Sequence, residues 1–417
     1  MGPDETTAMK VLHIATMDHG GAGIAARRIH EALLQQGVDS HVLCRFKRSS
    51  APDVTAAQPD MGLYRPPKNK LLRKWQQMQR RRGNCLTEVE RYERQMAMLD
   101  RQYGAAFTLP ISNFDLAQHP LVQQADVIHL HWVENFVDYP TFFAHVKKPI
   151  VWTFHDENIA FGGFHYSDEA QRLKEPFACL EEPFAKIKSN ALAAASDIHM
   201  VALCQPMARF YRDHSLANRF PVEIIYNGIR PDDFQVLDRR FCRQVLGVPE
   251  ENRVVCFCAS EINDKYKGLG LLVAALEQLQ LPDLTLLCVG EGPLPRTPVH
   301  TVGTGPISNP RLLSMAYSAA DLYAMPSLQE SFSQTSVEAM ACGCPVVATP
   351  CGIIEELITE HNGIRCTDFT AEALADGLRT ALGRQYDRQA IRSDATERFD
   401  IALIARQYLD LYRRCVS

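Results

Sequence analysis

The chain has 417 residues, of which 46% are hydrophobic and 22% are charged, and its formal net charge at neutral pH is −5. This length exceeds what one ordinary hydrophobic core accommodates and predicts two or three domains. The negative charge argues against general nucleic-acid binding, and no apolar run reaches the length of a membrane helix. Thirteen scattered cysteines, several inside apolar runs, indicate a reducing compartment, so we expect a cytoplasmic protein.

A glycine-containing turn follows the first predicted strand, KVLHIAT. Gly21 and Gly23 lie in this turn, before an amphipathic helix and a second strand, HVLC. The amides of such a turn can cradle a phosphate. The G-G-x-G spacing and the lack of an acid after HVLC argue against a dinucleotide-binding fold. A tight turn without a ligand is the open alternative.

The segment from residue 64 to about 110 differs in character from its surroundings and predicts an insertion in the first domain. RPPKNKLLRKWQQMQRRRG is rich in Lys and Arg, with a partial apolar face that includes Trp75, and EVERYERQMAMLDRQY predicts a second helix. A basic amphipathic helix suits an anionic membrane surface or an anionic acceptor, which would place the protein peripherally at the inner face of the membrane. A solvated helical hairpin that covers the sheet is an equal alternative.

Polar residues follow two apolar strands in the first half of the chain. His131 follows DVIHL, and His155 and Asp156 follow PIVWTF. Because ligands of open α/β sheets bind at the carboxyl ends of strands, we expect these three residues to converge. Farther on, the turn pair Asn227-Gly228 ends the strand at which the second domain is predicted to begin.

The second half of the chain carries a cation at one predicted helix start and two acids around another. Lys267 precedes an apolar helix, where an ammonium group and free amides together can neutralise a diphosphate. Glu330 and Glu338 flank the start of the helix after DLYAMP, and carboxylates accept hydrogen bonds from sugar hydroxyls. Two acids at one spacing are weak evidence alone, since a capping acid and a solvated helix residue give the same pattern. The residues nearest this helix start, with amides available to an anion, are Ser331, Phe332 and Ser333.

ESFSQTSVEAMACGCPVVAT followed by GIIEEL closely resembles the donor-site signature of GT-B glycosyltransferases, in the retaining group called family 4. In that family the first Glu meets donor sugar hydroxyls and the second meets the ribose, roles that would fall on Glu330 and Glu338. WTFHDENIAFGGFHY resembles a subgroup that acts in exopolysaccharide, capsule or colanic-acid-type assembly, and it places His155 at the family's active-site histidine position. In the family, the loop that carries Lys267 usually also contains an Arg. This sequence has Ser260 and Glu261 at that place instead, with Lys265 as a candidate substitute.

The resemblance implies an α/β chain of the GT-B class, with two doubly wound Rossmann-like domains facing across a cleft. An acceptor-side domain would span residues 9–219, a nucleotide-sugar donor domain 220–390, and a helix over 391–417 would cross back to the first domain. The implied enzyme is a retaining, metal-independent hexosyltransferase without a cofactor. It would move a hexose from a UDP- or GDP-linked donor to a hydroxyl of a saccharide or lipid-linked saccharide. The implied catalytic residues are His155, Asp156 and Glu330, and the implied donor-binding residues are Gly21, Gly23, Lys267, Ser331, Phe332, Ser333 and Glu338.

Two other functions are compatible with the same residues. A sugar-nucleotide epimerase would use this fold without an acceptor, and analysis of the products formed from a UDP-sugar alone would distinguish it from a transferase. A non-catalytic sugar-nucleotide binding protein is the other alternative. Retention of His155, Lys267, Glu330 and Glu338 argues against it, because a silent relative would be expected to lose some of them.

Overall fold

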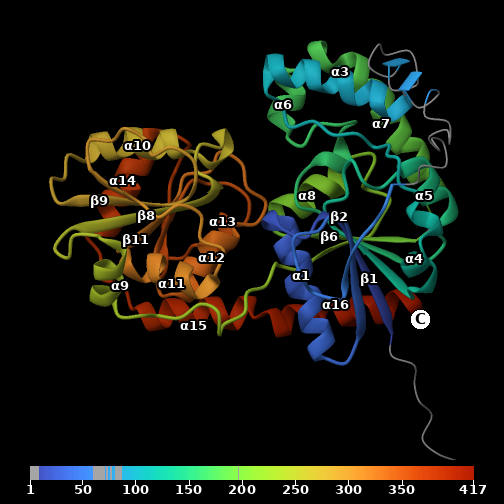
Figure 1. The fold of residues 1–417 in the computed structure, drawn as a ribbon. Helices are drawn as coiled ribbons and strands as arrows, with labels where there is room; N and C mark the ends of the chain where they lie inside the picture. The colour runs from blue at the N-terminus through green and yellow to red at the C-terminus, as the bar shows by residue number, and fades with distance from the viewer. Residues whose placement is uncertain (1–8, 60–70, 72–73, 76–77, 80–86, 196) are drawn as a thin grey trace, which may run out of the picture. The chain divides into compact units, whose positions relative to one another are not determined.

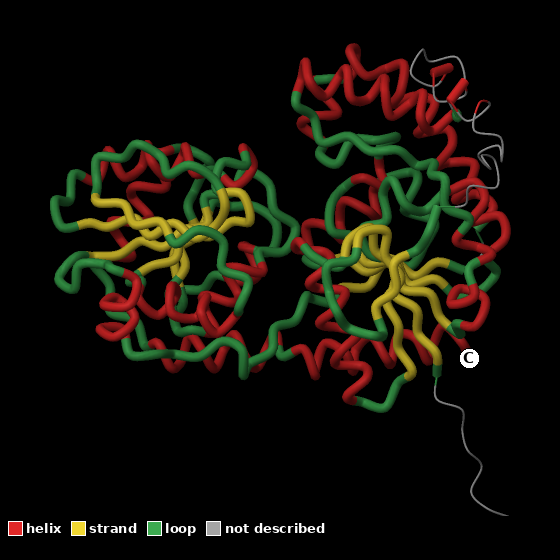
Figure 2. The backbone as a smooth tube through the Cα atoms, in the orientation of Figure 1, coloured by secondary structure: helices red, strands yellow, loops and turns green. Residues whose placement is uncertain are grey.

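A computed structural model describes residues 9–59, 71, 74–75, 78–79, 87–195 and 197–417. The chain forms two compact units, each built around its own sheet (Figure 2). The first unit comprises residues 1–202, 208–223 and 408–417, and the second comprises residues 203–207 and 224–407. The predicted pair of doubly wound Rossmann-like sheets is therefore confirmed.

The sheet of the first unit has the strand order β3-β2-β1-β4-β5-β6-β7. Strands β4 and β5 are buried along their whole length, as expected for apolar runs in the middle of a parallel sheet. The order reverses between β1 and β4, so the crevice of this sheet is expected at their carboxyl ends. The strands are β1 (Lys10–Met17), β2 (Asp39–Phe46), β3 (Val54–Ala56), β4 (Val127–Leu130), β5 (Ile150–Thr153), β6 (Ile198–Ala202) and β7 (Val222–Ile224).

Helices cover both faces of this sheet (Figure 1). The helices of this part of the chain are α1 (Gly20–Gln35), α3 (Glu88–Tyr103), α4 (Pro120–Gln124), α5 (Tyr139–His145), α6 (Ser167–Arg172), α7 (Lys174–Ala194) and α8 (Gln205–Asp213), of which α3 and α6 pack against α7. The second predicted helix of the insertion is present as α3. It begins with a capping box between Thr87 and Glu90 and ends at Gly104. Its apolar face packs with α7 around Phe107, Phe164 and other aromatic side chains. The basic helix predicted before it lies largely outside the described residues.

The sheet of the second unit has the order β10-β9-β8-β11-β12-β13, and all of its neighbouring strands are parallel. The order reverses between β8 and β11, which places the expected ligand crevice at their carboxyl ends. The strands are β8 (Arg253–Glu261), β9 (Leu284–Glu291), β10 (His300–Gly303), β11 (Leu322–Met325), β12 (Val346–Ala348) and β13 (Gly363–Arg365).

The helices of the second unit pack against both faces of its sheet. One apolar core lies under α10 and α14, where Leu272, Leu276, Leu374 and Leu378 are fully buried. The helices are α9 (Arg239–Leu246), α10 (Leu269–Leu279), α11 (Pro310–Ala319), α12 (Gln334–Ala341), α13 (Ile354–Leu357), α14 (Ala371–Leu382) and α15 (Arg388–Phe399).

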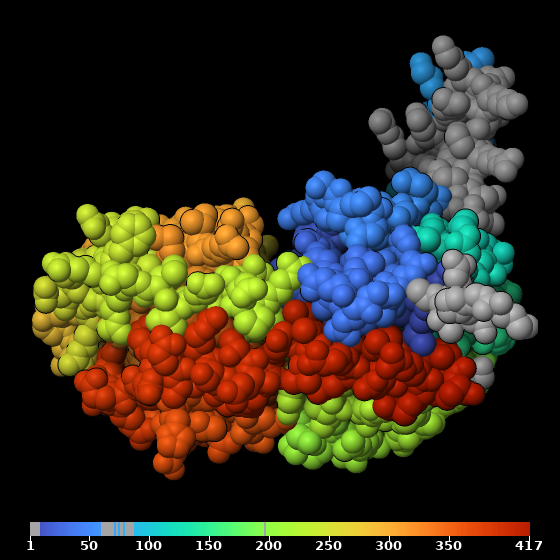
Figure 3. All heavy atoms as spheres, turned by 90° about the horizontal axis from the view of Figure 1, so that it is seen from below, coloured from blue at the N-terminus to red at the C-terminus, as the bar shows by residue number. Residues whose placement is uncertain are grey.

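The last helix, α16 (Ile401–Val416), belongs to both units: residues up to 407 are part of the second and those from 408 are part of the first. Its C-terminal part lies at the surface beside N-terminal elements of the first unit (Figure 3). Tyr408 and Tyr412 are completely buried against the first sheet. Among the described residues, none of the helices combines the length and hydrophobicity that crossing a membrane demands.

Candidate active site

Two loops meet at the carboxyl ends of β8 and β11, where the ligand crevice of the second sheet is expected. Lys267 ends a short 3-10 turn after β8, and Glu330 lies in the loop between β11 and α12. The Nζ atom of Lys267 is 2.8 Å from Oε2 of Glu330. The negative charge of Glu330 raises the pKa of Lys267, so the ammonium group stays charged at neutral pH. Sequence reasoning named both residues, and the structure brings them into direct contact.

Two glycines let these loops approach closely. Gly268 has a positive φ of 72°, and a Cβ there would lie 2.0 Å from the carbonyl oxygen of Pro326. Gly352 has a φ of 57°, and its Cβ would lie 1.8 Å from the carbonyl oxygen of Glu330. Any other residue at either position would force the backbone apart as well as strain it. The positions of Lys267 and Glu330 therefore depend on glycine.

The structure excludes the ordinary explanations for the two acids. The N-cap of α12 is Ser333, whose hydroxyl lies 3.4 Å from the amide of Ser336, so Glu330 does not cap the helix. Glu338, on α12, is only 6% exposed and is therefore not a solvated helix residue.

The three residues that were predicted to offer amides to an anion at the start of α12 differ in what their side chains contact. The Ser333 hydroxyl also lies 2.7 Å from that of Ser336, so this side chain takes part in hydrogen bonding within the helix start. The Phe332 side chain is buried and packs near the rings of Tyr226 and Phe399, which holds the loop in place. Ser331 lies between Phe332 and Glu330 and is partly exposed.

Two loops at the carboxyl ends of β1 and β4, where the crevice of the first sheet is expected, also hydrogen bond to each other. The Thr16 amide donates to the carbonyl of Trp132 at 2.7 Å, and its hydroxyl donates to the carbonyl of Glu134 at 2.8 Å. Gly21 and Gly23 lie in the first turn of α1, so the predicted turn is already helical. A Cβ on Gly23 would lie 2.4 Å from the carbonyl oxygen of Met17, so Gly23 allows helix and strand to pack closely.

A row of histidines crosses the carboxyl half of this sheet. His13 on β1 is the register partner of His129 on β4, and Nδ1 of His13 lies 3.0 Å from Nε2 of His131. The ring of His155 is 5.8 Å from that of His131, so the predicted convergence at the strand ends is present. Burial lowers the pKa of His155 to about 4, which makes the imidazole neutral at pH 7.

The nitrogens of His13, His129 and His131 lie within 4.8 Å of one another, close enough to consider a metal site. Both nitrogens of His129 are already engaged, however: Nδ1 is 2.6 Å from the hydroxyl of Tyr412 and Nε2 is 2.8 Å from that of Thr153. His129 would have to lose one of these hydrogen bonds to bind a metal. The contacts present instead join α16 to the sheet.

Asp156 lies at the centre of a buried network. Its carboxylate accepts hydrogen bonds from Nδ1 of His165 at 2.6 Å, from Nε1 of Trp132 at 2.9 Å and from the amide of Asn158 at 3.0 Å. Although burial alone would raise it, the charge and hydrogen bond of His165 hold the pKa of Asp156 below its ordinary value. A carboxylate with three donors is suited to positioning its neighbours.

Sequence reasoning did not identify the partners of this network. Lys188, from α7, donates to the side-chain oxygen of Asn158 at 2.5 Å and to its carbonyl at 2.7 Å. Glu181, from the same helix, accepts from the amides of Gly162 and Gly163. The motif GGFHY signalled His165, but no local pattern could have identified the two residues on α7.

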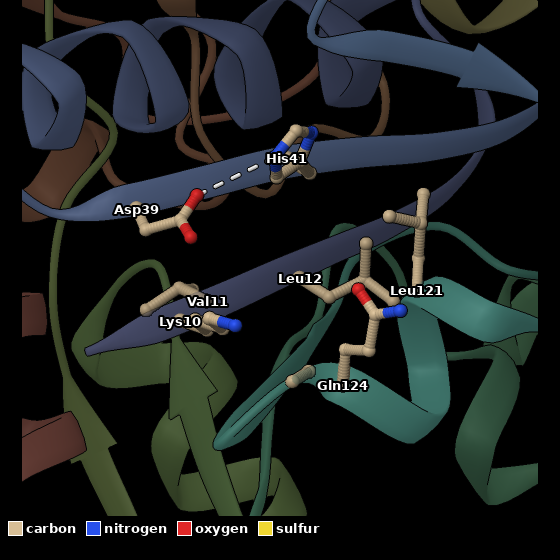
Figure 4. Close-up of a pocket in the computed structure, with 8 residues that line it drawn as sticks. Lys10, Val11, Leu12, Asp39, His41, Leu121 and Gln124 are labelled. Atoms are coloured by element: carbon tan, nitrogen blue, oxygen red, sulfur yellow. Dashed lines mark ion pairs between the residues drawn. The ribbon is translucent and has the colours of Figure 1, made fainter. Parts of the chain in front are cut away.

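A small pocket also opens at the opposite edge of the first sheet (Figure 4). It lies at the amino ends of β1 and β2, beside Leu121 and Gln124 of α4, and the ion pair between Asp39 and His41 borders it. Ligands of open α/β sheets bind at the carboxyl ends of the strands, whereas this pocket lies at the amino ends. It is therefore separate from the site described above.

Two models of known protein families match this chain. A profile described as "Glycosyltransferase Family 4" matches residues 19–233, which is half of the chain, and one described as "Glycosyl transferases group 1" matches residues 252–384. The chain belongs to glycosyltransferase family 4. Membership of this family, which the resemblance of the E-x7-E segment predicted, is thus confirmed.

Curated relatives of this family 4 protein are distant. An uncharacterized glycosyltransferase of Methanocaldococcus jannaschii is 26% identical over 318 residues, which cover 70% of this chain and 76% of the archaeal protein. A D-inositol 3-phosphate glycosyltransferase of Segniliparus rotundus is 31% identical over 186 residues, 41% of each protein. The match therefore spans less than half the length of this second relative.

Solved structures confirm the GT-B fold of the family 4 chain. Anabaena HepE in complex with UDP and glucose has a TM-score of 0.64 at 18% identity, covering 97% of this chain and 100% of HepE. Sucrose-phosphate synthase from Thermosynechococcus elongatus has a TM-score of 0.62 at 20% identity, covering 97% and 98%. At these identities the likeness shows the fold alone.

Proposed function

We propose that this protein is a retaining glycosyltransferase that moves a hexose from a nucleotide diphosphate sugar to a hydroxyl of a saccharide or lipid-linked saccharide. The observation that carries the proposal is the Lys267–Glu330 ion pair at the crevice of the second sheet, with the buried Glu338 on the adjoining helix. The HepE structures, which contain UDP or UDP-glucose, favour a UDP-linked donor. The second unit is then the donor domain and the first unit the acceptor side.

The leaving group determines what the donor site must supply. When the bond between the anomeric carbon and the β-phosphate oxygen breaks, negative charge develops on the nucleoside diphosphate. Lys267, whose pKa Glu330 raises, provides a cation, and the amides around Ser331 and Ser333 provide dipoles at the start of α12. This charge stabilisation requires no metal ion in our proposal.

The two acids bind hydroxyl groups. Glu330 would accept a hydrogen bond from the hexose while its other oxygen contacts Lys267, and Glu338 would accept one from the ribose. Buried carboxylates that bind hydroxyls discriminate strongly against analogues that lack those hydroxyls. Sugar selectivity should therefore depend on Glu330 more than on any apolar contact.

The acceptor side supplies a neutral imidazole. Because burial keeps His155 neutral at pH 7, it can accept a hydrogen bond from an acceptor hydroxyl or donate one to the hexose. The acceptor oxygen forms the new bond to the anomeric carbon on the face that the leaving group vacates. The acceptor proton passes to the departing phosphate, which balances the reaction without an added base. The GGFHY segment and the glycines Gly21 and Gly23 also lie in the first unit, and these two glycines would help to bind the donor phosphate.

The test separates donor binding from transfer in a Glu330→Gln variant. UDP-glucose and GDP-mannose are screened by thermal shift, and the donor that stabilises the wild type is then assayed with p-nitrophenyl glycosides as acceptors. We expect Glu330→Gln to bind the nucleoside diphosphate alone nearly as well as the wild type but to transfer hexose at least a hundredfold more slowly.

Glu360, an exposed acid of the same unit, is the matched control, and Glu360→Gln should retain full activity. Unchanged transfer by Glu330→Gln would reject the donor-site assignment. Conversion of the UDP-sugar to an epimer without any acceptor would instead establish an epimerase, and donor binding without turnover would establish a binding protein.

A further inference from the structure

Trp132 occupies the place in the first unit where a ligand is expected. It follows β4 at the carboxyl edge of the sheet, directly at the reversal of strand order between β1 and β4. Its carbonyl is bonded to the amide of Thr16 after β1, so the two loops of the crevice meet at this residue. Trp132 is half-buried, so part of the residue is accessible to solvent.

The polar atom of this indole is already satisfied. Nε1 donates to the carboxylate of Asp156 at 2.9 Å, and the ring lies 5.7 Å from that of His165 at an interplanar angle of 32°. A tryptophan with its N–H held in this way presents carbon atoms of fixed orientation to its remaining surroundings. The indole ring is therefore held in one orientation at the carboxyl edge of the sheet.

His165 and Asp156, which contact the indole of Trp132, form further hydrogen bonds to other residues. Nε2 of His165 lies 2.9 Å from the hydroxyl of Thr108, and the carbonyl of Asp156 accepts a hydrogen bond from Tyr211. The side-chain nitrogen of Asn158 donates to the carbonyls of Gly163 and Phe164, which closes the loop between Asp156 and His165. Such a network of buried hydrogen bonds fixes a surface group more firmly than packing alone.

We propose that Trp132 binds the acceptor saccharide by stacking against the C–H face of a sugar ring, and that His165, acting through Asp156, positions the indole for this contact. A pyranose ring carries hydroxyls around its rim and C–H bonds on its faces, and the negative face of an indole attracts those C–H bonds. The inference rests on the proposed function and names the chemistry that recognises its acceptor.

The first test measures acceptor kinetics in variants of Trp132. With UDP-glucose and the p-nitrophenyl glycoside that gives the most product with the wild type, Trp132→Leu should raise the acceptor KM at least tenfold. Trp132→Phe, which keeps a smaller aromatic face, should raise it less, and the Kd for UDP should stay within twofold in both variants. Phe241→Leu removes an exposed aromatic side chain from α9 and is the control that should change nothing.

The second test addresses His165. Of the three tryptophans in the chain, Trp132 is observed by subtracting the emission spectrum of Trp132→Phe from that of the wild type. We expect His165→Ala to shift this difference spectrum to longer wavelength and to raise the acceptor KM several-fold. His165→Asn retains a donor near the position of Nδ1 and should restore both properties toward wild type, a rescue that a merely structural role would not give.

The outcomes separate this inference from the function on which it rests. Absence of hexose transfer by the wild type to any acceptor overturns the proposed function, and this inference with it. Transfer by the wild type with an acceptor KM that neither Trp132→Leu nor Trp132→Phe changes overturns the stacking contact alone. If Trp132→Leu does not fold, the acceptor KM of Trp132→Phe alone decides whether the stacking contact exists. Equal losses in His165→Ala and His165→Asn overturn the positioning role.

Discussion

The ammonium group of Lys267 and the carboxylate of Glu330 form an ion pair of 2.8 Å that joins the loop after β8 to the loop after β11. These are the two central strands of the second sheet, between which the strand order reverses. In the proposed donor site, Lys267 would contact the diphosphate while Glu330 would accept a hydrogen bond from the sugar. The pair would then link phosphate recognition to sugar recognition within one unit.

Replacing Lys267 should weaken binding of the whole diphosphate. A hydrogen bond to a charged group contributes about 1.5–3 kcal/mol, so Lys267→Ala should raise the Kd for UDP by roughly 10- to 150-fold. Isothermal titration with UDP measures the effect. Arg240→Ala, which removes an exposed cation on α9, should leave the Kd unchanged. A Kd for Lys267→Ala within twofold of the wild type would mean that Lys267 does not contact the diphosphate.

Gly268 and Gly270 offer a matched pair of substitutions two residues apart. Gly268→Ala places a Cβ 2.0 Å from the Pro326 carbonyl at a positive φ, so the melting temperature should fall by several degrees and UDP affinity should fall with it. Gly270 lies inside α10 with open space around its Cβ position, so Gly270→Ala should raise stability by up to about 1 kcal/mol. Thermal unfolding of both variants tests the close approach of the two loops. Equal changes in melting temperature in the two variants would contradict it.

Much of this site follows from local sequence. Apolar runs of four to eight residues predict the central strands, and a parallel sheet must bring their carboxyl ends to one edge, which is why His131 and His155 are found near each other. The E-x7-E segment fixes Glu330 and Glu338 around one helix start. Their contact partners are less local, since Lys267 reaches Glu330 only because β8 and β11 are neighbours.

Helix α7 shows what sequence patterns do not predict. It runs for 21 residues with Pro183 in its interior, where the missing N–H ordinarily ends a helix. Burial of Phe177, Leu180 and Phe184 in the aromatic cluster with α3 compensates for the lost hydrogen bond. The pairing of Lys188 with Asn158 depends on how this helix docks, and docking is a property of the tertiary structure.

Tyr412 should contribute to stability through its hydroxyl, which lies 2.6 Å from Nδ1 of the fully buried His129. Tyr412→Phe leaves that nitrogen without its partner and should cost about 1–3 kcal/mol, or roughly 2–12 °C in melting temperature. Tyr139 is equally buried, but its hydroxyl has no hydrogen-bond partner among the described residues. Tyr139→Phe should therefore be neutral or stabilising, and a similar loss in both variants would contradict the role assigned to the His129 contact.

The buried histidines should make the protein less stable in acid. Burial, together with neighbouring His129 and His13, lowers the pKa of His131 well below 6.5. As the pH falls from 7.5 toward 5, the unfolded chain takes up a proton at about pH 6.5 that the folded chain refuses, so the free energy of unfolding decreases. His131→Asn removes this proton linkage and should reduce the drop in melting temperature between pH 7.5 and pH 5 by roughly 2 °C or more. His41→Asn replaces a histidine that is 43% exposed and should retain the full drop, whereas an identical pH dependence in His131→Asn would show that His131 is protonated in the folded protein.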